Sequence, residues 1–324
     1  MSIDLLLKLF GLLAVTLIGY GAARMRAFGS PDATRVLSNA AFNLFAPALM
    51  FRTTARLDTE GMPWHLLLAY FLPVLAWMAV VRWVHLSRRP AQAAQPAVQA
   101  VTLGFGNSVQ VGIPMAATVF GDAGLKLHLA IVSVHGLVLL GTATVWAELD
   151  LARATARDSG KRPPLWPTVR STLRNAVIHP VVLPVLVGLA WNLAGLTIPG
   201  PLDDSLQMLG QAVVPLCLVL IGASLAQHGL GPRWRLALGL ALLKLFALPT
   251  LVLVVAHWGF GLGGLPLAVV VIAAAMPTGS NALLFAQRYR LLEAEATAVI
   301  VLSTLLFALA VPVWLSVLGA FGSP

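Results

Sequence analysis

Ten long apolar runs constrain this chain more than any other feature of its sequence. A helix needs about 20 mostly apolar residues to cross a bilayer. Only 10% of the 324 residues are charged, against about 25% in soluble domains, so solvated groups could not cover a globule of this size. The sequence therefore predicts an all-α membrane protein with helices over residues 3–20, 35–51, 64–84, 97–120, 124–146, 175–196, 206–226, 236–258, 265–289 and 294–318.

The basic residues are divided unevenly between the two sets of connections. Sixteen of the 21 Lys and Arg residues lie in the connections that follow the odd-numbered runs. Four lie at the opposite ends of the runs, and Lys244 lies within a run. Cytoplasmic loops carry an excess of Lys and Arg. We therefore expect the first set in the cytoplasm and both termini outside. The net charge of +9 then reflects orientation and not nucleic-acid binding.

Two pairs of prolines indicate an internal repeat. Pro47 and Pro215 are 168 residues apart in the second and seventh runs, and Pro114 and Pro277 are 163 apart in the fourth and ninth. Five runs in each half make the second half enter the membrane from the opposite face, an inverted repeat typical of secondary transporters. The alternative is coincidence, because proline is common in membrane helices. The predicted parts are a first repeat, a basic cytoplasmic loop and a second repeat, at 1–147, 148–174 and 175–324.

The fourth and ninth runs contain clusters that weaken a helix. Residues 104–114 hold three Gly, one Pro and three polar side chains, and residues 276–281 read Met-Pro-Thr-Gly-Ser-Asn. Such helices open where they line a hydrated cavity, and the N–H groups that start each second half attract an anion. The alternative is a pair of kinks with polar contacts between helices. The predicted substrate site comprises Asn107, Ser108, Gln110, Pro114, Pro277, Thr278, Ser280 and Asn281, with Asn43 before Pro47.

Two further ionisable side chains lie within runs, where each is costly. Lys244 is either a charge near the site or a side chain that reaches toward water. His135 is either a proton-coupling group or a neutral, hydrogen-bonded histidine of the bundle. No metal-ligand spacing, no mid-run carboxylate and no catalytic motif stands out. The sequence thus predicts no enzyme, no metal and no cofactor.

Five segments, at residues 38–50, 106–121, 179–188, 214–225 and 275–284, recur across nearly the whole chain in the order found in one transporter family. On these segments the chain resembles the auxin efflux carrier family, within the bile/arsenite/riboflavin transporter superfamily.

This resemblance implies ten helices in two inverted repeats, with the fourth and ninth crossing at Pro114 and Pro277. Helices 1, 2, 6 and 7 would form a scaffold that dimerises, and the others a transport domain that moves like an elevator. Asn107 matches a substrate-contacting residue, and Asn281 lies at the corresponding point of the ninth run. The short central connection is similar to that of bacterial members, which implies the inner membrane.

The predicted function is transport of small organic anions, such as malonate, malate or auxin-like acids, across that membrane. Coupling to H⁺ or Na⁺ is one expected way of driving this transport, and His135 is the candidate proton site. The alternatives are a sodium-coupled carrier of bile-acid type and a membrane receptor that binds carboxylates without moving them. The expected partners are the anion, the bilayer and a second copy of the chain.

Overall fold

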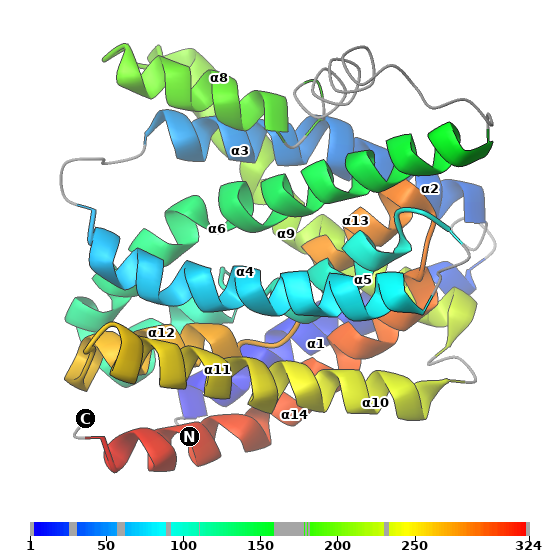
Figure 1. Cartoon of the computed structure of the whole chain (residues 1–324). Helices are drawn as coiled ribbons and strands as arrows, with labels where there is room; N and C mark the ends of the chain where they lie inside the picture. The colour runs from blue at the N-terminus through cyan, green and yellow to red at the C-terminus, as the bar shows by residue number, and fades with distance from the viewer. Residues whose placement is uncertain are drawn as a thin grey trace.

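A computed structural model describes residues 3–25, 31–56, 62–88, 92–109, 111–158, 178, 180, 182–229 and 233–321. Across these residues the fold is helical and contains no β-strand, which confirms the predicted all-α class (Figure 1). Its helices, with π-helical turns marked η, are α1 Ile3–Arg24, α2 Pro31–Ala40, η1 Ala41–Phe45, α3 Ala46–Ala55, α4 Trp64–Ser87, α5 Gln95–Gly104, α6 Gly112–Asp158, α8 Val182–Leu193, α9 Gly200–His228, α10 Trp234–Leu242, η2 Leu243–Ala247, α11 Leu248–Val254, η3 Val255–Gly259, α12 Gly264–Ala275, α13 Asn281–Tyr289 and α14 Glu293–Gly319.

Several helices have the length and composition of membrane spans. Within the described residues five segments are long and apolar enough to cross a bilayer. The apolar helices α8 and α12 are shorter, with 12 residues each. The five long segments are Trp64–Ser87, Met115–Thr155, Gly200–Gln227, Trp234–Gly259 and Glu293–Gly319.

Helix α6 extends beyond the expected end of the fifth run. It continues from residue 146 to Asp158, into the segment predicted as a loop. Two contacts hold this extension: Arg82 of α4 forms an ion pair with Asp150, and the Tyr289 hydroxyl donates to Glu148 over 3.3 Å. Gly121, with φ of 61°, marks the joint between the fourth and fifth runs, because a left-handed backbone suits glycine.

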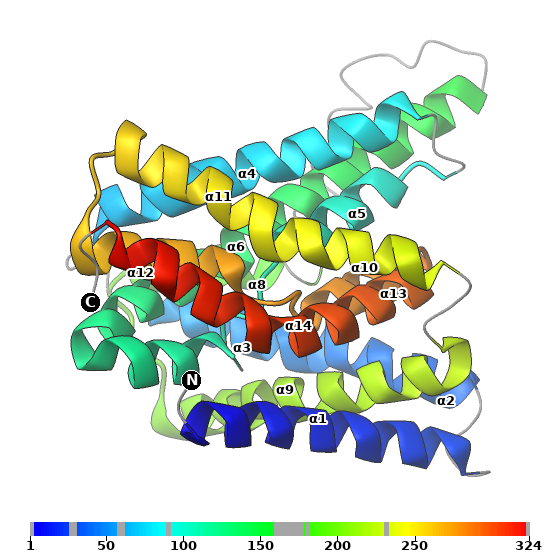
Figure 2. The same ribbon diagram turned by 90° about the horizontal axis from the view of Figure 1, so that it is seen from below.

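Helices α1 and α9 pack side by side along one edge of the molecule, and α3 packs against α8 (Figure 2). Both pairs approach closely through glycine. A Cβ on Gly222 of α9 would overlap the backbone of Thr16 and Tyr20, and one on Gly188 of α8 would overlap Thr54. Small residues let membrane helices come together backbone to backbone. These two pairs therefore form tightly joined units.

Helix α12 lies in the interior of the molecule. All nine residues from Leu267 to Ala275 are buried, against α4, α6, α11 and α14. A helix that is apolar on every side must be surrounded by protein or lipid. Its burial among other helices puts the segment that follows it, residues 276–280, inside the protein.

Candidate functional site

Both predicted clusters interrupt their helices. Helix α5 ends at Gly104 and α6 begins at Gly112, while α12 ends at Ala275 and α13 begins at Asn281. Glycine and proline weaken a helix at these points, and each interruption leaves backbone groups that need other partners. The two interrupted segments supply many of these partners to each other.

The interrupted segments cross through an antiparallel bridge between Gly106 and Thr278. The N–H groups of Asn107 and Gly279 donate across it to carbonyl oxygens of the other segment, over 2.7 and 2.9 Å. A Cβ on Gly279 would lie 2.9 Å from the Phe105 ring and 3.0 Å from the Gly106 oxygen. Glycine is thus required for the two backbones to approach this closely.

Neighbouring side chains satisfy further backbone groups at the crossing. The Thr278 N–H donates to Ser303 over 3.0 Å, and its hydroxyl donates to the Thr102 carbonyl over 2.9 Å. The first N–H of α6, at Gly112, donates to the Asn107 carbonyl over 3.0 Å. In α13 the Ala282 N–H likewise donates to the Gly279 carbonyl over 3.0 Å. The expectation that the second half-helices begin with unpaired N–H groups is therefore wrong at Gly112 and at Ala282, because each crossing segment turns back on itself.

Carbonyl groups near the ends of α5 and α12 each accept a hydrogen bond from a side chain. The Trp77 indole N–H donates to the Leu103 carbonyl over 3.1 Å, and the Lys244 ammonium donates to the Ala274 carbonyl over 2.8 Å. A cation at a helix C-terminus is stabilised by the helix dipole. Lys244 is only 1% exposed, so it does not reach toward water, and the alternative of a snorkelling side chain is wrong.

A cavity of about 440 Å³ lies beside the crossing, a volume in the usual range for small-molecule sites. One wall comes from α3 and α9, and the other from the crossing segments and α6. The cavity brings together five of the predicted residues: Asn107, Ser108, His135, Ser280 and Asn281.

His135 is a buried polar group in the cavity wall. Its Nδ1 lies 3.4 Å from the Ser108 hydroxyl, and its ring contacts Phe105 with centroids 4.5 Å apart. Its Nε2 has no hydrogen-bond partner among the described residues. His128, for which no role was predicted, contacts the Ser108 carbonyl through its Nε2 over 2.8 Å. Both histidines therefore help to position Ser108.

The remaining predicted site residues lie elsewhere. Asn43 is exposed, donates to the Asn39 carbonyl of its own helix over 2.8 Å, and is not among the residues that line the cavity. Pro277 and Thr278 are used within the crossing, and Lys244 lies behind it; none of the three lines the cavity. Gln110 and the Pro114 side chain lie outside the described residues, as does the short connection after residue 158.

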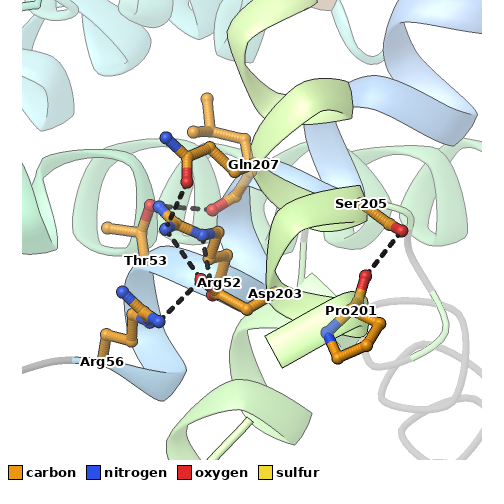
Figure 3. A network of polar contacts seen from close by, with 8 residues as sticks. Arg52, Thr53, Arg56, Pro201, Asp203, Ser205 and Gln207 are labelled. Carbon is orange, nitrogen blue, oxygen red and sulfur yellow. Dashed lines mark hydrogen bonds and ion pairs between the residues drawn. The ribbon is translucent and has the colours of Figure 1, made fainter. Parts of the chain in front are cut away.

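A charged cluster borders the cavity at the far end of α3 (Figure 3). Arg52 forms a two-pronged ion pair with Asp203 of α9, with Nε and Nη2 at 2.9 and 3.1 Å from its oxygens, and Nη2 also donates to Gln207 over 3.1 Å. Arg56 contacts Asp203 at 2.6 Å from the more exposed side. The sequence analysis missed this cluster, because it treated Arg52 only as part of a connection between two runs. The available signal was a cation within one helical turn of the apolar residues that face the cavity.

The cavity offers amides, hydroxyls, an imidazole and one guanidinium, a set of donors suited to an anion. No group of three or more His, Cys, Asp or Glu side chains that could hold a metal ion occurs in the described part of the chain. Apolar side chains such as Leu49 and Val213 form much of the remaining wall. The arrangement can bind a small carboxylate with an apolar body.

Comparison with known proteins gives consistent matches over nearly the full length. The model of a family described as "Membrane transport protein" matches residues 4–315. An uncharacterized transporter, YfdV, of Escherichia coli K12 is 23% identical over 317 residues, which cover 95% of this chain and 96% of its own. A Rhizobium meliloti protein named "Putative malonate transporter" is 24% identical over 306 residues, 93% of this chain and 91% of its own. An uncharacterized transporter of Methanothermobacter thermautotrophicus is 25% identical over 309 residues, 94% of this chain and 96% of its own.

Proposed function

Because the chain belongs to the auxin efflux carrier family of membrane transport proteins, we propose that it carries small organic anions across a membrane by alternating access. Its family and relatives are transporters and not enzymes. The relative named for malonate makes malonate the first substrate to test.

The single observation that carries this proposal is the cavity at the crossing. Asn107 and Asn281 come from the two interrupted segments and line one cavity with Ser108 and Ser280. Helix α13 begins at Asn281, so its positive end borders the same space. Preorganised amides and a helix N-terminus bind carboxylates without needing a metal ion.

An inverted repeat of two five-helix halves is part of the proposal, and the helix contacts support it. Gly222 lies against Tyr20, and Gly188 lies against Thr54. Tyr20 and Gly188 are 168 residues apart, as are Thr54 and Gly222, which is also the spacing of Pro47 and Pro215. A repeat with this offset would relate the α1–α9 contact to the α3–α8 contact.

The proposed mechanism is an elevator. The close pairs α1–α9 and α3–α8 would form a static scaffold that also joins two copies of the chain, and the crossing segments with α4, α6, α11 and α14 would move. Both termini are proposed to lie outside a bacterial inner membrane. Coupling to H⁺ or Na⁺ belongs to the same proposal, and His135 is the residue at which proton coupling is tested.

The test is counterflow in vesicles that contain the purified full-length protein. We expect labelled malonate or malate to exchange, with an aromatic acetate as the comparison substrate. Asn107→Ala and Asn281→Ala each remove a hydrogen bond to a charged ligand, worth about 1.5–3 kcal/mol, so affinity should fall about 10- to 100-fold. Asn43→Ala is the matched control, because Asn43 is exposed and off the cavity.

Four outcomes decide between the proposal and its alternatives. Unchanged affinity and flux in both crossing variants would refute the site. Binding without exchange in sealed vesicles would favour a receptor. Exchange that requires Na⁺ on the substrate side would favour a sodium-coupled carrier, and a response to an imposed pH gradient alone would favour H⁺.

A further inference from the structure

Arg52 is the cation that borders the cavity, and half of its terminal donors are unused. Nε and Nη2 are engaged by Asp203 and Gln207. Nη1 has no hydrogen-bond partner among the residues that the structure describes, and its two N–H groups can bind a ligand. The side chain is 25% exposed, so it is partly buried and partly accessible to solvent.

Asp203 holds this guanidinium in place without neutralising the cluster. Its side chain is 8% exposed and accepts from both Arg52 and Arg56, so two guanidinium groups share one carboxylate. A two-pronged ion pair fixes the plane of an arginine. Asp203 and Gln207 are therefore positioning residues that leave Nη1 available; Figure 3 shows both of them beside Arg52.

Helix α9 lines the cavity between this cluster and the crossing. Asn281 and Val213 line a small recess that adjoins the cavity, whereas Arg52 is bonded at Gln207. Val213 lies six residues further along α9, about 9 Å at about 1.5 Å per residue. Both ends of this stretch line the same cavity as Arg52 and Asn281, so a diacid in the cavity can reach Arg52 with one carboxylate and Asn281 with the other.

We infer that Arg52 Nη1 is a second carboxylate subsite, which selects short dicarboxylates over monocarboxylates of the same chain length. One carboxylate binds at Asn107 and Asn281, and the other binds Arg52. Opposite walls of the cavity supply the two subsites, α3 the arginine and the crossing segments the amides. The inference rests on the proposed function only in assuming that the cavity binds carboxylates.

The test compares acids that differ by one carboxylate. Dissociation constants for malonate against propionate, and for succinate against butyrate, are measured by calorimetry on the full-length protein in detergent. We expect the wild type to prefer each diacid at least tenfold. Arg52→Gln should lower that preference at least tenfold. Arg56→Gln, which removes the other guanidinium on Asp203 from a position outside the cavity, should change it less than twofold.

A preference that is unchanged in Arg52→Gln, or that falls equally in Arg56→Gln, would overturn the inference. Arg52→Lys keeps the charge but not the planar fork, and an intermediate preference is expected; it also carries the test if Arg52→Gln does not fold. Vesicle exchange separates this result from the proposed function. Binding with normal selectivity but no exchange would refute transport and leave the subsite intact, and exchange with unaltered selectivity in Arg52→Lys and Arg52→Gln would refute the subsite alone.

Discussion

Two pairs of arginine and aspartate in this protein have nearly the same chemistry and different surroundings. Arg52 and Asp203 join α3 to α9, and Arg82 and Asp150 join α4 to α6; both pairs are two-pronged through Nε and Nη2. In both, a second arginine contacts the same carboxylate, Arg56 or Arg153. Of these residues, only Arg52 lines the cavity.

The surroundings of each pair decide what its charge can do. The Arg82 guanidinium lies over the Trp146 ring, 5.5 Å from its centroid, and the side chain is 16% exposed. Its role is to hold the extended end of α6 against α4. Both arginines leave Nη1 without a hydrogen-bond partner among the described residues, but only Arg52 lies at the cavity. A buried ion pair alone thus indicates neither stability nor binding; the cavity beside Arg52 makes the distinction.

Arg82→Gln is the change that should separate stability from binding most strongly. It leaves Asp150, which is 5% exposed, with only the longer contact to Arg153, so unfolding should become easier by about 1–3 kcal/mol. The preference for malonate over propionate should stay at the wild-type value. Thermal unfolding in detergent and calorimetry measure the two effects.

The control for this change is Arg153→Gln. Arg153 contacts the same carboxylate at 3.4 Å but is 67% exposed, and exposed ion pairs contribute about 0–1 kcal/mol. Its thermal midpoint should remain close to that of the wild type. A loss of diacid preference in Arg82→Gln would abolish the distinction between the two pairs.

Lys244→Met extends the comparison to a buried cation behind the crossing. The change removes the donor to the Ala274 carbonyl at the end of α12, and a buried acceptor without a partner costs about 1–3 kcal/mol. Relief of the buried charge offsets part of this loss, so we expect a smaller destabilisation than in Arg82→Gln. Diacid preference should again be unchanged, because Lys244 does not line the cavity.

Two further variants serve as comparisons for Lys244→Met. Lys126→Met makes the same chemical change at an exposed position and should alter stability by less than about 0.5 kcal/mol. Trp77→Phe removes the equivalent donor from the Leu103 carbonyl at the end of α5. If Lys244→Met reduced the affinity for malonate and propionate as strongly as Asn281→Ala, Lys244 would belong to the binding site.

The sequence predicted the positions of the interruptions closely. Clusters of glycine, proline and polar residues disfavour a helix wherever it is placed, so the ends of α5 and α12 follow from local composition. The approximate extents of the long helices follow from apolar length in the same way. Both features depend on residues that are near one another in the chain.

Side-chain direction could not be predicted in this way. Asn43 and Asn281 are both amides within apolar runs, yet one bonds to its own helix and the other lines the cavity. The partner of Arg52 is 151 residues away, and that of Thr278 is in another helix. The rotation of a helix about its axis decides which face meets which neighbour, and it depends on packing between helices. A single sequence does not specify that rotation.

His135→Phe should give the smallest effect, and it tests whether another side chain in the cavity wall acts like Arg52. The change removes the 3.4 Å contact that orients the Ser108 hydroxyl and keeps a ring beside Phe105. A neutral hydrogen bond contributes about 0.5–1.5 kcal/mol, so affinity for malonate and propionate should fall together by about 2- to 10-fold. Exchange in response to a pH gradient should persist, because the ring is 1% exposed and its described polar contact is a hydroxyl. Loss of that response with normal malonate binding would instead assign proton coupling to His135, and loss of diacid preference would move the second subsite away from Arg52.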